Sequence, residues 1–406
     1  MTCNGWKETT VGVFSPFTYG KGLPEKKRNA SGEVKVYGSN GVVGVHDQAL
    51  VGGPGIIIGR KGTVGTVTYS PTPFWPIDTT FYVTEEPDSR DLLYTYYLLK
   101  SLGLELMNAD SAVPGLNRDA AHAKSIKVPP LPEQHAIARI LSTLDDRIEL
   151  NRKMNATLEA IAQAIFKSWF VDFDPVRAKM ECEEPTRMDA ETVALFPDEF
   201  EEINETKVPK GWKVKSLDEI ATYLNGLALQ KHPPEREEYL PVIKIAQLRR
   251  GDTEGADKAS PHLDTAYIVD NGDVLFSWSG SLTVVLWSGG RGALNQHLFK
   301  VTSDRYPKWF YYLWTKHHLP EFQAIASGKA TTMGHIQRHH LSDAIVLVPP
   351  PDQLELMDRT LSPIISRIVA NDVQSRTLAT IRDTLLPKLI SGEIRVPDAM
   401  LEAAEA

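Results

Sequence analysis

The feature that most constrains the fold is a long amphipathic helix pattern that the chain makes twice. The first copy runs from Leu131 to about Phe170, and the second begins at Pro350. Matching positions lie 220 residues apart, and they include Asn151 and Asn371, Leu158 and Leu378, Ile161 and Ile381, Ile165 and Leu385, and Val176 and Val396. The register slips by one residue nearer the start of the two copies. The chain is therefore a tandem repeat in which each half contains one long helix.

Apolar residues in both copies recur at alternating spacings of three and four, which indicates a coiled-coil seam. The first seam comprises Ile137, Leu141, Leu144, Ile148, Asn151, Asn155, Leu158, Ala162, Ile165 and Trp169, and the second Leu361, Ile364, Ile368, Asn371, Ser375, Leu378 and Leu385. A seam is buried only against a partner helix, so we predict that the two helices pack on each other. Because the chain must return after the second globular region, the pair should be antiparallel. Residues 132–170 would then form a rod of roughly 58 Å between two domains.

Polar residues at matching seam positions predict how the two helices align. Asn151 is the midpoint of residues 132–170, so in an antiparallel pair of related helices it should lie opposite its repeat mate, Asn371. A polar pair weakens an apolar seam but fixes its register, since a shifted alignment would bury an amide without a partner. We expect these two residues to set the helix-pair register.

Length and composition limit the class of protein. A chain of 406 residues exceeds one ordinary core and fits two or three domains. Its two cysteines, Cys3 and Cys182, favour a reducing compartment over a structural disulfide. Met1–Trp6 lacks the pattern of a signal peptide, and no apolar run approaches the roughly 20 residues of a membrane span. We expect a soluble cytoplasmic protein without a membrane partner.

The distribution of charge is more informative than the net charge of -8. Residues 1–127 carry a net charge of +1 and residues 207–347 carry +3, whereas residues 128–206 carry -9 and residues 348–406 carry -3. The acidic excess thus lies in the helices and linker. The two globular regions are slightly basic, which permits phosphate contact without requiring it.

The globular regions are rich in short β-branched runs between turns, which predict strands. In the first region the expected strands are 34–37, 42–45, 56–58, 64–68 and 79–83, followed by a helix over 90–102; in the second they are 242–246, 274–278, 282–286 and 297–301, followed by a helix over 307–315. Glu181–Lys207, with Pro185 and Pro197, is acidic and lacks periodicity, so we expect a linker there.

These signals divide the chain into six segments. The predicted segments are a first globular domain (1–127), a first helical spacer (128–176), an acidic linker (177–206), a second globular domain (207–347), a second helical spacer (348–396) and a C-terminal tail (397–406).

Three possible chemical centres do not meet the requirements of their chemistry. The glycine-rich stretch from Gly53 to Thr63 lacks the Gly-Lys-Ser/Thr ending of a phosphate loop, which favours a strand-turn-strand. The acidic residues around Asp198 and Glu205 lack a strand that would present them as a nuclease metal site. His335, His339 and His340 have helical spacing for zinc but no cysteine, and the first half has no matching histidines. We predict no catalytic residues and no metal site.

Several stretches resemble the type I restriction-modification DNA specificity (S) subunits. They are PLPEQHAIARIL from Pro130, IFKSWFVDFDP from Ile165, LFPDEFEE from Leu195, VPKGWK from Val208 and LLPKLISGEI from Leu385. The resemblance spans the whole chain. It implies an α+β fold with two α/β target-recognition domains, each similar to the small DNA-recognition domain of adenine methyltransferases. Two long antiparallel helices forming a coiled coil would separate them in a pseudo-twofold tandem repeat.

The resemblance also implies a non-catalytic subunit. Each domain would recognise one half of a bipartite, asymmetric target in double-stranded DNA, and the helices would set the gap and dock other subunits. The implied partners are two methyltransferase (M) subunits and two motor-nuclease (R) subunits. The chain itself would bind no cofactor, because S-adenosylmethionine, ATP and Mg²⁺ are used by those partners.

Turn residues with forked, amide or hydroxyl groups are the candidates for DNA contact. Arg and Lys suit guanine, Asn and Gln suit adenine, and any of them can contact phosphate instead. The candidates are Lys21, Asn40, Arg60, Lys61, Thr63 and Arg118 in the first domain and Lys231, Gln247, Arg249, Ser279, Gln296 and Arg338 in the second. Two other functions stay open from the residues alone: a stand-alone enzyme, and a duplicated coiled-coil protein-binding adaptor without DNA specificity.

Overall fold

The computed structural model describes residues 5–107, 115–181, 188, 190–203, 205–235, 237–328 and 334–397. Cys3, Cys182 and Pro185 lie outside the described residues, as does the predicted tail from residue 398 onward. The chain divides into two compact units. The first comprises Met1–Ile148 with Leu378–Ala406, and the second comprises Glu149–Thr377. Among the helices of the described residues, none has both the length and the apolar composition needed to cross a membrane.

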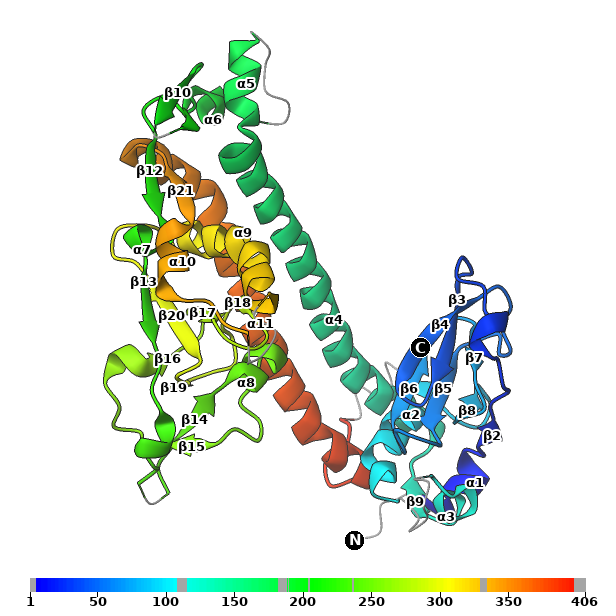
Figure 1. Cartoon of the computed structure of the whole chain (residues 1–406). Coiled ribbons are helices and arrows are strands. Elements are labelled where there is room, and N and C mark those ends of the chain that lie inside the picture. Colours follow the sequence, from blue (N-terminus) through cyan, green and yellow to red (C-terminus); the bar gives the residue numbers. More distant parts are fainter. Residues whose placement is uncertain are drawn as a thin grey trace. The chain divides into compact units, whose positions relative to one another are not determined.

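The two predicted long helices are present as α4 (Leu131–Lys167) and α11 (Pro351–Ser391), and both appear as continuous ribbons in Figure 1. Pro132 and Pro351 lie in their first turns, where a missing N–H leaves no intrahelical bond unmade. A single π-helical turn (Ser168–Asp172) and α5 (Asp174–Met180) follow α4.

The long helices run antiparallel within each unit. In the first unit, Asp145 of α4 forms an ion pair with Arg382 of α11, and Glu133 of α4 forms one with Arg395, which follows the end of α11. In the second unit, Asn155 Nδ2 donates to the Ile368 carbonyl at 3.1 Å. Rising numbers along α4 thus meet falling numbers along α11, as the connectivity of the chain predicts.

The first globular region contains one ribbon and two small sheets. Strand β1 (Lys7–Thr10) pairs with β9 (Ser125–Val128). One sheet has the order β2 (Thr18–Tyr19), β8 (Thr80–Thr84), β5 (Gly55–Gly59), β6 (Val67–Ser70), and the other β4 (Gly41–His46), β3 (Val34–Gly38), β7 (Phe74–Pro76). The helical elements are α1 (Val11–Phe14), η1 (Glu25–Lys27), α2 (Leu92–Ser101), η2 (Leu104–Leu106) and α3 (Arg118–His122). The main core joins the sheet that contains β5 and helix α2 to the start of α4 and the end of α11, whereas Tyr37, Val51, Ile57 and Phe74 form a separate apolar cluster.

The second globular region repeats this plan. Strand β12 (Lys213–Ser216) pairs with β21 (Ile345–Val348). The sheet β13 (Thr222–Asn225), β20 (Leu298–Thr302), β17 (Val274–Ser277), β18 (Thr283–Leu286) matches β2-β8-β5-β6, and the other sheet is β15 (Lys258–Ala259), β14 (Leu240–Ile243), β19 (Gly292–Leu294), β16 (Ile268–Val269). The helical elements are α7 (Leu217–Ile220), η4 (Leu229–Lys231), α8 (Ile245–Arg250), η5 (Thr265–Tyr267), α9 (Lys308–Ser327) and α10 (Arg338–Asp343).

In the globular regions, three predicted element boundaries differ from the structure by three residues or more. Strand β6 begins at Val67, because Gly62 and Gly65 adopt positive φ angles and make residues 62–66 a turn. The strand predicted over 242–246 ends at Ile243, since Lys244 begins a capped helix, α8. Helix α9 continues past 315 to Ser327, because Phe322 and Ala326 extend its buried face.

The predicted linker is partly folded. It contains α6 (Ala190–Ala194), and its end forms a hairpin between β10 (Phe200–Ile203) and β11 (Thr206–Pro209). Phe196 is only 2% exposed and packs against Trp169 and Trp212. The acidic composition obscured a few apolar anchors, and these anchors attach the segment to the core of the second unit.

Candidate nucleic-acid interface

The loops of the first globular region meet at one carbonyl group, that of Thr79. The backbone N–H groups of Arg60 and Lys61 donate to it at 2.9 and 3.1 Å, and Ser39 Oγ donates at 2.6 Å. The Arg60 carbonyl in turn accepts from the Leu116 N–H at 2.9 Å. Four segments that are distant in sequence are thereby held side by side.

Two arginines flank one exposed aromatic ring in this region. The guanidinium carbons of Arg60 and Arg118 lie 5.4 and 5.0 Å from the ring centroid of Tyr19, which is 49% exposed. Arg60 also donates through Nε and Nη2 to the Asp78 carbonyl, at 3.1 and 2.5 Å. These contacts hold both cations in place beside a ring face.

We define the first surface as Tyr19, Arg60 and Arg118 together with Lys21, Asn40, Lys61 and Thr63. The last four residues are exposed on adjoining loops, whereas Arg60 and Arg118 are half-buried. Asn40 lies in the turn between β3 and β4, beside Ser39. Lys21 follows β2, and its N–H donates to the Pro76 carbonyl at 3.0 Å. The structure therefore brings all six predicted residues of the first domain into one set of adjoining loops.

His122, one turn beyond Arg118, remains part of the scaffold. Burial lowers the pKa of its imidazole, and the Arg118 guanidinium lowers it further. The neutral ring accepts the Phe17 N–H through Nε2 at 2.9 Å. We therefore leave His122 out of the contact set.

The second region has the same backbone frame with different side chains. The Ile336 N–H donates to the Trp278 carbonyl at 3.0 Å, as Leu116 does to Arg60, and Ser279 bridges to His335 as Lys61 bridges to Gly115. Trp278 therefore occupies the position of Arg60. Its Nε1 donates to Asn225 Oδ1 at 2.9 Å, and its ring centroid lies 5.9 Å from those of His297 and Phe299.

Arg338 is the counterpart of Arg118. Each begins a short helix, α10 or α3, directly after its N-cap residue. The Arg338 guanidinium carbon lies 5.6 Å from the Phe299 ring centroid, and Nη2 donates to the Tyr223 carbonyl at 3.3 Å. We define the second surface as Asn225, Trp278, Gln296, His297 and Arg338.

The other predicted residues of the second domain separate into two groups. Gln247 is 7% exposed and accepts the Lys244 N–H through Oε1 at 3.3 Å, and Ser279 is 3% exposed and bonded to His297 Nδ1 at 3.0 Å. Both side chains are committed to the fold, so we remove them from the contact set. Lys231 and Arg249 are exposed, and Arg249 borders a cleft of about 410 Å³ with residues of α9 and α11.

Sequence reasoning missed Tyr19, Asn225, Trp278 and His297. The available signal was an aromatic residue beside each small-residue turn. The equivalence of Tyr19 and Asn225 follows only from the strand register, because Tyr19 pairs with Phe81 in one sheet as Asn225 pairs with Phe299 in the other. Among the described residues, no group of three or more His, Cys, Asp or Glu side chains could hold a metal ion.

Comparison with known proteins identifies the family. The model of the type I restriction modification DNA specificity domain matches residues 4–160 and again residues 209–375. The chain belongs to this family. It is 29% identical to the MjaIX specificity subunit of Methanocaldococcus jannaschii over 75% of this chain and 69% of that protein. It is 26% identical to the HindI specificity subunit of Haemophilus influenzae over 78% of this chain and 80% of that protein.

A solved structure of this family has the same fold. The type I restriction-modification S subunit from M. genitalium matches with a TM-score of 0.60 at 15% identity, over 95% of this chain and 96% of that chain. Both specificity domains of this chain contain the start of a long helix as well as a globular region.

The helix seam of this family member carries buried amides within the second unit. Asn151 Nδ2 donates to the Asn371 carbonyl at 3.3 Å, to Gln374 Oε1 at 2.9 Å and to Ser375 Oγ at 3.2 Å. Asn371 Nδ2 donates to Asn155 Oδ1 at 2.8 Å. The two predicted asparagines thus touch, but their amides pair with the neighbouring layer instead of with each other. Side chains of antiparallel helices interleave in this way, as knobs pack into holes.

Proposed function

We propose that this chain is the sequence-specific DNA-binding subunit of a type I restriction-modification complex. Each globular region recognises one half of a bipartite, asymmetric target, and the helices set the gap between the halves. The observation that carries this proposal is the pair of matched frames with unlike side chains, Arg60 with Tyr19 in one and Trp278 with Asn225 in the other. One backbone frame presenting two sets of side chains suits two different half-sites.

The chemistry of the two surfaces suits duplex DNA. Arginine can bind guanine edges or phosphates, and amides can bind adenine. The family membership favours this function over that of an adaptor without DNA specificity. The flanking lysines of the first surface supply the sequence-independent phosphate attraction on which base recognition builds.

The partners in this proposal are two methyltransferase subunits and two motor-nuclease subunits. S-adenosylmethionine, ATP and Mg²⁺ act in those subunits, and this chain contributes DNA selection only. Rigorously purified chain should therefore neither methylate nor cleave DNA, and turnover by it would contradict a non-catalytic role.

A domain exchange tests the proposal directly. Residues 207–347 are replaced by the corresponding region of another family member, and methyladenine is mapped genome-wide in a host with and without the gene. We expect one half of the methylated motif to change while the other half and the gap stay the same. A change in both halves would rule out independent recognition, and an unchanged motif would rule out DNA selection by this region.

A further inference from the structure

The connection between β2 and β3 is strongly basic. Residues 20–33, which contain η1 and which we call the η1 loop, carry four Lys or Arg residues against two Glu residues, a net charge of +2. The whole first domain carries only +1. The first surface includes Lys21 alone of these four cations, so DNA recognition as proposed above leaves Lys26, Lys27 and Arg28 without a role.

The η1 loop is tied at both ends beside residues of the first surface. Before η1, the Lys21 carbonyl accepts the indole N–H of Trp75 at 2.8 Å. After η1, Arg28 Nη1 donates to the Val43 carbonyl at 2.8 Å. Val43 lies in β4, which begins directly after the turn that holds Asn40. Helix η1 thus lies in a short stretch whose two ends both adjoin the first surface.

Lys26 and Lys27 are the exposed cations of η1. Among the residues that the structure describes, neither ammonium group has a hydrogen-bond or ion-pair partner. Arg28, by contrast, donates to two backbone carbonyls and holds the loop in place. An ammonium group is a compact point charge with three donors, which suits the oxygens of a phosphate.

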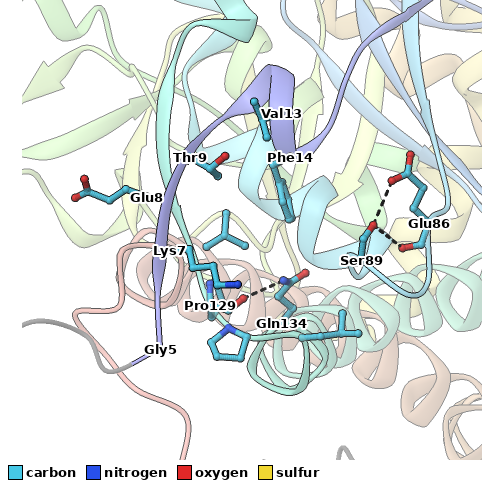
Figure 2. A pocket seen from close by; sticks show the side chains of 13 residues that line it. Gly5, Lys7, Glu8, Thr9, Val13, Phe14, Glu86, Ser89, Pro129 and Gln134 are labelled. Carbon is cyan, nitrogen blue, oxygen red and sulfur yellow. Dashed lines mark hydrogen bonds between the residues drawn. The ribbon is translucent and has the colours of Figure 1, made fainter.

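A groove beside β1 in the same unit has a different balance of charge. It has a volume of about 520 Å³, and Figure 2 shows Lys7 there together with Glu8 and Glu86. One ammonium group among two carboxylates leaves no net positive charge for a phosphate. Lys7 therefore serves as a reference for a lysine of this domain that does not contact DNA.

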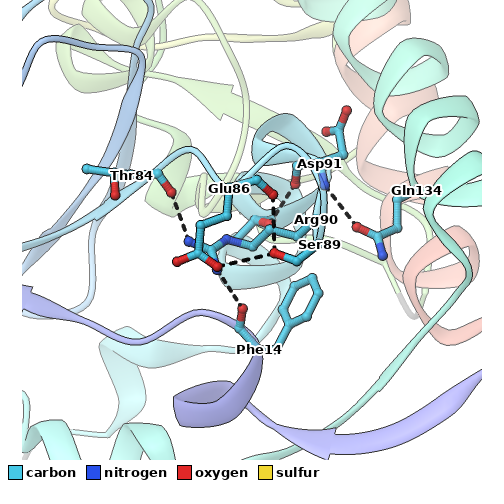
Figure 3. Close-up of polar contacts among 8 residues, drawn as sticks. Phe14, Thr84, Glu86, Ser89, Arg90, Asp91 and Gln134 are labelled. Carbon is cyan, nitrogen blue, oxygen red and sulfur yellow. Dashed lines mark hydrogen bonds and ion pairs between the residues drawn. The ribbon is translucent and has the colours of Figure 1, made fainter.

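Arg90, at the same groove, is committed to the fold. It is 3% exposed and donates to the carbonyls of Phe14 and Thr84 at 3.0 and 2.9 Å. It also pairs with Glu86 at 2.8 Å (Figure 3). A cation that is buried and paired in this way cannot reach DNA, in contrast to the two exposed lysines of η1.

The second domain has an equivalent loop of opposite charge. Residues 226–239 connect β13 to β14, contain η4 and, like the η1 loop, number 14. The Lys21 N–H donates to Pro76, the last residue of β7, at 3.0 Å. The Leu227 N–H donates in the same way to Leu294, the last residue of β19, at 3.0 Å. This second loop has two Lys or Arg residues against three Glu residues, a net charge of -1.

We propose that the η1 loop binds the DNA backbone beside the first half-site, with Lys26 and Lys27 each contacting a phosphate. The second domain lacks this contact, because its equivalent loop is acidic overall. The sequence-independent part of DNA binding is therefore unequal between the two halves of the chain. This inference rests on the proposed function, because that function supplies the DNA duplex.

The salt dependence of DNA binding tests the proposal. The full chain, assembled with the methyltransferase subunits of its own system, is titrated at several salt concentrations with a duplex carrying its methylated motif and with a random duplex. The test variant is Lys26→Ala with Lys27→Ala. The matched control is Lys7→Ala with Lys127→Ala, which removes the same charge from the same domain, at two lysines close to Glu8.

We expect the test variant to lower the slope of log affinity against log salt by about 1.8, twice the value of about 0.9 for one phosphate contact. Both duplexes should lose affinity equally, because a phosphate contact carries no sequence information. The control variant should keep the slope of the parent. Lys26→Arg with Lys27→Arg retains both charges and should also keep it. Circular dichroism checks that all variants fold.

Two results would overturn the proposal while the proposed function stands. One is a salt slope that is unchanged in the test variant, and the other is a slope that falls as much in the control, which would reduce the effect to net charge. In both cases the unaltered complex still prefers the duplex with its motif. If the unaltered complex shows no such preference, the proposed function fails together with this inference.

Discussion

The first and second surfaces share their backbone and differ in their side chains. In both, a turn after the central strand is tied to the segment before a short helix, and an arginine begins that helix. The first surface then places Arg60 on Tyr19, whereas the second places Trp278 against Asn225 and His297. Holding the frame constant while the side chains vary lets two halves of one chain recognise different sequences without refolding either half.

The shared arginines give the largest expected effect. Arg118→Ala should weaken binding to duplexes carrying the first half-site, and Arg338→Ala to those carrying the second, each by about 1–3 kcal/mol. Fluorescence titration with duplexes altered in one half at a time measures this. Arg305→Ala is the control, because Arg305 is exposed and belongs to neither surface.

Lysine replacements separate the two ways in which these arginines can act. Arg118→Lys and Arg338→Lys retain the charge but lose the forked geometry. If lysine restores binding, the contact is to phosphate; if it does not, the contact is to a base edge. An equal loss for both half-sites from either alanine variant would contradict independent surfaces.

The difference in charge between the surfaces predicts a difference in salt dependence. Lys61→Ala should lower the slope of log affinity against log salt by about 0.9, the value for one phosphate contact. Ser279→Ala, at the matching position, should leave the slope unchanged, because Ser279 is buried against His297. Equal salt slopes for the two variants would show that both surfaces contact the DNA phosphates in the same way.

The helix seam extends the comparison to the gap between half-sites. The Asn155–Asn371 contact and the Ser375–Asn151 contact are repeat mates, related by the 220-residue offset. Replacing Asn151 and Asn371 with leucine should preserve or raise the melting temperature, since Asn155 still bonds Asp372 at 2.7 Å. It should also loosen the register, so that methylated motifs show more than one gap length.

Methyladenine mapping together with thermal unfolding checks this prediction. Asn151→Ala with Asn371→Ala is the matched control, because it removes both amides without adding apolar bulk. A single unchanged gap length in the leucine variant would show that the amides do not set the register.

The smallest expected effect concerns Asp372, which Asn155 contacts in the same seam. Burial raises the pKa of this carboxyl, although the bond from Asn155 opposes the shift. The folded state therefore binds a proton more tightly than the unfolded state, and stability falls as pH rises from the ordinary value near 3.8 through the raised value.

Asp372→Asn should remove this loss and raise the melting temperature slightly at pH 7, with the advantage disappearing below the ordinary aspartate pKa. Thermal unfolding across that pH range measures the effect. The melting temperature of the variant minus that of the parent should be larger at pH 7 than at low pH. The opposite order would contradict the direction of the pKa shift.

The sequence by itself determined the repeat, the two long helices and their antiparallel pairing. Seam residues such as Ile137 and Leu361 alternate at three and four, and this periodicity leaves few ways to bury an apolar face. The loops around Thr79 were also predictable as a set, because turn residues such as Arg60 and Asn40 follow clear strand signals.

Only the tertiary structure decided which side chains remain available in those loops. Gln247 and Ser279 have the chemistry of DNA contacts, yet burial commits them to a helix cap and to His297. Asn225 became the counterpart of Tyr19 through the strand register, which depends on hydrogen bonds between segments distant in sequence. Periodicity encodes local structure and the face it buries, whereas the pairing of distant turns depends on packing that no local pattern specifies.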